Sequence, residues 1–62
     1  MPVVKISLFT GRDKEIKKKI AQDITEILVK NLNISPEAVI ILFEDLEKHN
    51  FYQAGKSGED LS

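Results

Sequence analysis

The chain has 62 residues, and its nine Lys and Arg against ten Asp and Glu give a formal net charge of −1 at pH 7. This balance provides no overall field for nucleic acid or an anionic membrane, so we expect neither as a partner. The absence of cysteine excludes disulfides and thiolate metal sites, and the single histidine, His49, cannot build a zinc site. The longest apolar run, residues 38–43, is far shorter than the ~20 residues that span a bilayer, and Lys5 interrupts any signal-like amino terminus. We therefore expect a soluble, cytoplasmic protein with a single domain over residues 1–62, whose core is marginal at this length without self-association.

Residues 3–9 alternate between two faces, which is typical of a strand. One face would carry Val4, Ile6 and Leu8, and the other Val3, Lys5, Ser7 and Phe9. Gly11 permits a tight turn after this strand, and the Asp13 carboxylate can cap the first N–H groups of a helix.

Residues 14–32 carry a helical stripe of apolar side chains, namely Ile16, Ile20, Ile24, Ile27 and Leu28. The lysines at 17–19 share the solvent side with acidic residues, so we interpret them as a solvated face. Asn33 and Pro36 end the helix, because asparagine tolerates the left-handed conformation and proline cannot continue a helix.

Residues 38–43 are continuously apolar, which predicts a strand buried on both faces. One helix separates it from the first strand, so a right-handed βαβ crossover would make the two strands parallel. Residues 44–50 are predicted to be a polar loop, and residues 51–62 a short β-hairpin or a loop that docks on a neighbour. The fold class is thus α/β (or α+β), a single βαβ unit with a short carboxy-terminal hairpin. Its helix covers one sheet face, so another copy of the chain must cover the other.

Pro2 is a candidate general base. If Met1 is removed, Pro2 presents a free secondary amine, and α-amino groups titrate near pH ~7.7–8.0, or lower in an apolar or cationic setting. The alternative is that Pro2 only begins an edge strand, where a missing N–H costs little. Retention of Met1 would turn the nitrogen into an amide without basicity.

Met1-Pro2 opening a strand, Gly11-Arg12-Asp13 at the first turn, one long helix, and Asn50-Phe51 after a buried strand occur together. In this combination the whole chain resembles the 4-oxalocrotonate tautomerase family. The resemblance implies a cofactor-independent tautomerase that acts on a small 2-hydroxy-dienoate or enol-pyruvate-type carboxylate. It also implies a hexamer of three dimers, in which antiparallel first strands join two βαβ units into a four-stranded sheet.

The same resemblance implies roles for individual residues. Pro2 would be the general base, and Arg12 would bind a substrate carboxylate with its planar guanidinium. Phe51 would form the apolar wall of the pocket, and the backbone N–H of Phe9 would order the carbonyl end of the substrate. The alternatives are a solvated turn residue for Arg12 and an interface aromatic for Phe51.

The chain departs from the family at Ile40, where efficient dicarboxylate isomerases carry a second arginine that polarises the carbonyl oxygen. Its absence puts efficient dicarboxylate chemistry in doubt. Lys56 is the preferred substitute donor for substrate binding, ahead of His49 and Tyr52, although all three can be plain surface residues. The alternative function is a catalytically weak or inactive oligomeric binding or scaffold homologue.

Overall fold

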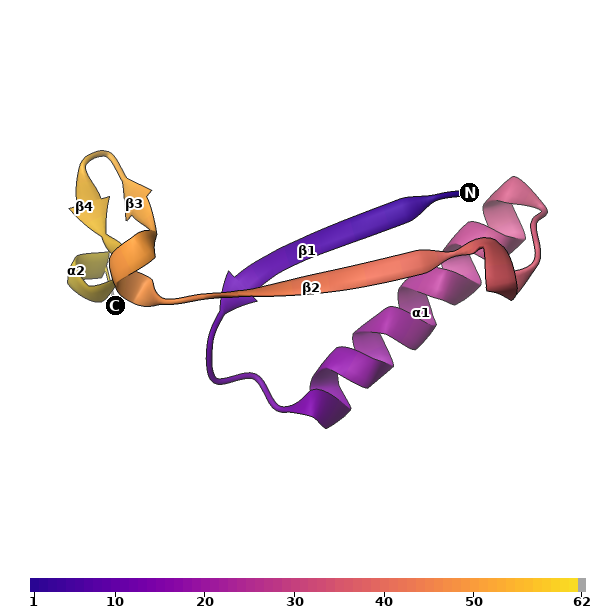
Figure 1. The fold of residues 1–62 in the computed structure, drawn as a ribbon, viewed down its shortest axis with the longest axis horizontal. Helices are drawn as coiled ribbons and strands as arrows, with labels where there is room; N and C mark the ends of the chain where they lie inside the picture. The colour runs from indigo at the N-terminus through magenta and orange to yellow at the C-terminus, as the bar shows by residue number, and fades with distance from the viewer. Residues whose placement is uncertain (62) are drawn as a thin grey trace.

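The computed structural model describes residues 1–61, and its centre is a pair of parallel strands joined by one long helix (Figure 1). Its elements are β1 (Val3–Phe9), α1 (Lys14–Leu32), η1 (Pro36–Ala38), β2 (Ile40–Leu46), η2 (Lys48–Asn50), β3 (Tyr52–Gln53), β4 (Lys56–Ser57) and α2 (Gly58–Leu61). The predicted βαβ unit with a carboxy-terminal hairpin is confirmed. Among residues 1–61, no helix combines the length and apolarity needed to cross a bilayer.

The predicted bounds of β1 and α1 are confirmed, and local signals account for them. Gly11 has a φ of 109°, which an L side chain rarely adopts, so it supplies the turn between the two elements. Asp13 caps α1, because its Oδ1 accepts a 2.9 Å hydrogen bond from the Ile16 N–H. Asn33 ends the helix in the left-handed conformation with a φ of 54°.

The predicted bounds of the second strand were wrong at both ends. Ala38 belongs to η1, and β2 begins at Ile40 and continues through Glu44 and Asp45 to Leu46, where a polar loop was expected. The two carboxylates remain in the strand because each has a partner, Ser7 for Glu44 at 2.9 Å and Lys17 for Asp45 at 2.6 Å.

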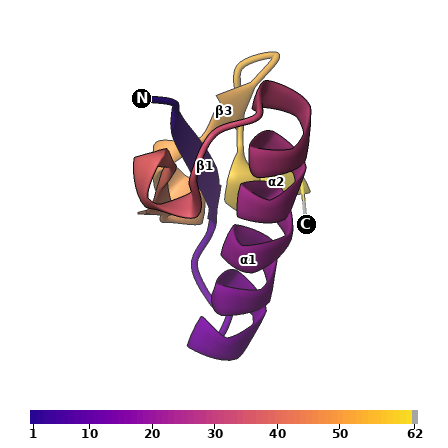
Figure 2. The ribbon, with the colours of Figure 1, turned by 90° about the vertical axis from the view of Figure 1, so that its right-hand side faces the viewer.

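Helix α1 lies against one face of the strand pair (Figure 2). The half-buried side chains of this layer are Val4, Ile6 and Leu8 from β1 and Ile20, Ile24 and Leu28 from α1. Ile16 and Ile27, predicted in the same stripe, are 48% and 58% exposed instead. The physical reason is width, since two strands offer too narrow a surface to cover the whole apolar stripe of a helix.

The opposite sheet face, which we call the open face, has no element of this chain over it. Val3, Leu42 and Ile40 on it are 57%, 50% and 36% exposed. The prediction that the second strand is buried on both faces is therefore wrong for a single chain. No hydrophobic side chain among residues 1–60 is fully buried.

The dimensions agree with this open arrangement. The Cα radius of gyration is 14.7 Å, whereas a compact domain of this length would have about 10.6 Å. The molecule is 42 Å long but only 13 Å thick. A single chain does not enclose a hydrophobic core, so its stability requires a further surface.

The carboxy-terminal segment forms a hairpin rather than an irregular loop. β3 and β4 are antiparallel, with Tyr52 opposite Ser57 and Gln53 opposite Lys56. Ala54 and Gly55 both have positive φ, 55° and 79°, as a two-residue type I′ turn requires.

Candidate active site

A cavity of about 280 Å³ lies at the carboxyl ends of β1 and β2. Six residues line it: Ser7, Leu8, Phe9, Arg12, Leu46 and Phe51. Three of them, Phe9, Arg12 and Phe51, are residues that the sequence singled out. The fold therefore brings together side chains that are up to 42 positions apart in the chain.

The turn after β1 positions Arg12. The Thr10 N–H donates to the Leu46 carbonyl at 3.0 Å, which ties the start of the turn to the end of β2. Gly11 then reverses the chain. Arg12 is exposed, and no salt bridge holds its guanidinium among residues 1–61. Its five N–H donors are available to an anion.

Phe51 forms the far wall of the cavity. Its ring meets that of Phe9 edge to face, with centroids 5.2 Å apart and an interplanar angle of 89°. The Phe51 N–H donates to the Lys48 carbonyl at 3.3 Å, and the Phe51 carbonyl accepts from the Gly58 N–H at 2.8 Å. A Cβ at position 58 would lie 2.9 Å from the Lys48 oxygen, so glycine allows this close approach. The backbone on both sides of the aromatic wall is thus fixed.

Ser7 and Glu44 form a polar floor that the sequence did not single out. Ser7 lines the cavity, and its Oγ donates to Glu44 Oε1 at 2.9 Å. Lys5 Nζ lies 3.8 Å from the same oxygen. Alternation along β1 places Ser7 on the face of Phe9, but only the strand register brings Glu44 opposite Ser7.

Pro2 lies at the other end of β1, beside the start of β2 (Figure 1). It is half-buried, and its carbonyl accepts from the Ile40 N–H at 3.0 Å. The seven residues of β1, at about 3.3 Å each, separate Pro2 from the cavity by roughly 20 Å or more. One chain therefore does not bring Pro2 and Arg12 together.

The other edge of β1 is free within residues 1–61, because the sheet order is β1-β2 only. Successive N–H groups of a strand point to opposite edges. Since Thr10 donates to β2, the Phe9 N–H points to the free edge. A free edge of this kind is a template for another strand.

The substitute donors considered for Ile40 lie outside the cavity. Lys56 is on β4, His49 in η2 and Tyr52 on β3, and each side chain is exposed. Ile40 itself is opposite Val3, next to Pro2. The end of the sheet that carries Pro2 is therefore flanked by apolar side chains of its own chain.

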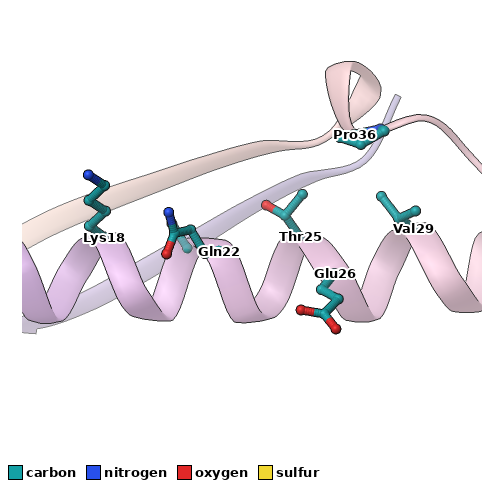
Figure 3. Close-up of a pocket in the computed structure, with 7 residues that line it drawn as sticks. Lys18, Gln22, Thr25, Glu26, Val29 and Pro36 are labelled. Carbon is teal, nitrogen blue, oxygen red and sulfur yellow. The ribbon is translucent and has the colours of Figure 1, made fainter.

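A larger cavity of about 470 Å³ lies between α1 and η1 (Figure 3). It is lined by Lys18, Ala21, Gln22, Thr25, Glu26, Val29 and Pro36. Figure 3 shows Lys18, Gln22, Thr25 and Val29 along one side of the helix, with Pro36 opposite them. None of the predicted site residues lines this cavity, so we assign the candidate site to the smaller one. Residues 1–61 contain no group of three or more His, Cys, Asp or Glu arranged to hold a metal ion.

Comparison with known proteins places this geometry in a family. The tautomerase enzyme family model matches residues 2–61. A probable tautomerase of Ralstonia nicotianae is 38% identical over 56 residues, which are 90% of this chain and 86% of the relative. A probable tautomerase of Lactococcus lactis is 39% identical over 56 residues, 90% of this chain and 92% of the relative.

Solved structures agree. A 4-oxalocrotonate tautomerase isozyme from Methylibium petroleiphilum is similar with a TM-score of 0.91 and 32% identity, over 97% of this chain and 94% of that one. A heterohexamer 4-oxalocrotonate tautomerase from Chloroflexus aurantiacus has a TM-score of 0.90 and 18% identity over the whole of both chains, a likeness of fold. With the family model matched along nearly its whole length, the chain belongs to the tautomerase enzyme family.

Proposed function

We propose that this protein is a cofactor-independent tautomerase whose general base is Pro2, exposed as an amine after removal of Met1. The substrate is a small enol that carries a carboxylate, of the 2-hydroxy-dienoate or enol-pyruvate type. Arg12 binds the carboxylate, Phe51 and Phe9 form the apolar walls, and the Phe9 N–H orders the carbonyl end of the substrate. Family membership supports the reaction class, and the residue roles are our proposal.

The carrying observation is the separation of Pro2 from the cavity that contains Arg12 and Phe51. Antiparallel pairing of two β1 strands through their free edges brings the first residues of one strand beside the last residues of the other. Pro2 of one copy then meets the cavity of its two-fold partner, and each dimer has two complete sites. The exposed Val3, Ile40 and Leu42 on the open face favour further association of such dimers. We propose a homohexamer, by analogy with the hexameric assembly described for the Chloroflexus aurantiacus structure.

In the proposed reaction the neutral amine of Pro2 removes the proton of the enol hydroxyl and returns it to a carbon further along the conjugated system. The enol becomes a 2-oxo acid, with no change in oxidation state and no leaving group. Arg12 fixes the carboxylate through two parallel N–H···O bonds. Its positive charge near the amine, together with the apolar walls, disfavours protonated proline and keeps the base neutral near pH 7.

Three measurements on the purified protein test this proposal: intact mass, ketonisation of phenylenolpyruvate and 2-hydroxymuconate, and the activity of Pro2→Ala. We expect a chain without Met1, measurable turnover of an enol carboxylate, and a large loss of kcat in Pro2→Ala with an unchanged oligomer. The exposed Lys30→Gln is the control and should keep full activity. Full activity of Pro2→Ala, or retention of Met1 in an active enzyme, would exclude the amine base. A chain without Met1 that turns over neither compound would indicate the binding or scaffold alternative.

A further inference from the structure

The polar floor of the cavity has no role in the proton transfer described above. Ser7 reaches the cavity from β1, two residues before Phe9, and donates its hydroxyl proton to Glu44 at 2.9 Å. The direction of this bond is fixed, because a carboxylate can only accept. The lone pairs of the Ser7 Oγ therefore remain free to accept a hydrogen bond.

The charge at this floor is negative and only partly compensated. Lys5 is 3.8 Å from Glu44 Oε1 and 62% exposed, so this ion pair is long and solvated. A substrate group next to Ser7 would meet an acceptor with a carboxylate behind it. Such a position favours a neutral hydroxyl donor and disfavours a second carboxylate.

The remaining walls define the rest of the ligand. Arg12, without a salt bridge among the described residues, offers one cationic position. The edge-to-face pair of Phe9 and Phe51 offers aromatic surface between that position and the floor. At about 280 Å³ the cavity is at the small end of ligand sites. It suits one ring with short substituents.

We propose that Ser7, supported by Glu44, is a specificity-determining residue that accepts a hydrogen bond from a hydroxyl group on the substrate's ring or chain. The preferred substrate class is then a monocarboxylate with an aromatic or similar planar body and a neutral hydroxyl at the end opposite the carboxylate. The inference rests on the proposed function for the reaction, but not for the binding preference.

The test compares two pairs of ligands that differ by one hydroxyl. The reactive pair is 4-hydroxyphenylenolpyruvate and phenylenolpyruvate, and the unreactive pair is the two corresponding phenylpropanoates, whose binding is measured by calorimetry. The wild-type oligomer should prefer the hydroxylated member of each pair by about five- to tenfold, the effect of one hydrogen bond. Ser7→Ala should remove this preference, and Glu44→Gln should reduce it while improving the binding of dicarboxylates.

Ser35→Ala is the matched control, because the Ser35 side chain makes no capping hydrogen bond; it should leave the preference unchanged. An equal preference in wild type and Ser7→Ala, in both pairs, would overturn the inference even if the enzyme is active. If neither enol is turned over, the proposed reaction fails. The calorimetric preference and its loss in Ser7→Ala would then still support the hydroxyl site.

Discussion

Replacement of Arg12 by alanine tests the carboxylate anchor. In the structure the guanidinium lines the cavity and has no salt bridge within residues 1–61, so its removal breaks no ion pair of the fold. Charge-assisted hydrogen bonds contribute about 1.5–3 kcal/mol, and we take about 1.5–2 kcal/mol because the group is exposed to solvent. At about 1.4 kcal/mol for each factor of ten, kcat/KM should fall about 10- to 30-fold.

The assay is ketonisation of phenylenolpyruvate by Arg12→Ala, Arg12→Lys and the control Lys14→Ala. Arg12→Lys should be intermediate, because lysine keeps the charge but loses the planar fork that holds both carboxylate oxygens. Lys14 is a nearby exposed cation that does not line the cavity, so its loss should leave kcat/KM within twofold. Equal losses in Arg12→Ala and Lys14→Ala would refute the anchor and indicate only general electrostatic attraction.

Two further predictions concern stability and assembly. Asp13→Ala removes the cap of α1 and should destabilise the protein by about 1 kcal/mol in thermal or denaturant unfolding; Asp23→Ala, which breaks only an exposed pair with Lys19, should cost far less, and equal costs would refute the cap. Leu42→Lys places a charge on the open face where half of the leucine is exposed, so size-exclusion chromatography should show a smaller or unfolded species, and an unchanged oligomer would mean that no copy covers this face.

The elements that the sequence predicted correctly depend on local signals. The alternation over β1, the Asp13 cap and the left-handed Asn33 all act within a few residues, so they are visible without the fold. The same holds for the hairpin, whose turn needs only the two left-handed residues Ala54 and Gly55.

The errors fall where distant residues decide. β2 continues through Glu44 and Asp45 because Ser7 and Lys17, contributed by other elements, pair with the two carboxylates. Hydropathy along the chain contains no information on these partners. The parallel register that sets Ser7 opposite Glu44 was equally unavailable, so the polar floor of the cavity was missed.

The site itself was predictable in part. Resemblance to the family singled out Phe9, Arg12 and Phe51, and the structure brings these three to one cavity. Lys56, proposed to bind substrate in place of the arginine missing at Ile40, lies outside that cavity in the single chain. Its role stays a prediction, because a second copy also contributes to the proposed site.

The central claim is that each active site combines Pro2 of one chain with Arg12 of another, and a mixing experiment tests it most directly. Pro2→Ala and Arg12→Ala are purified separately, each with low activity, then unfolded together in equal amounts and refolded. Random association leaves an intact Pro2 and an intact Arg12 in about a quarter of the sites, so we predict recovery of about a quarter of wild-type activity. Activity no greater than the sum of the two separate variants, in a mixture shown by mass spectrometry to contain mixed oligomers, would contradict a site shared between chains.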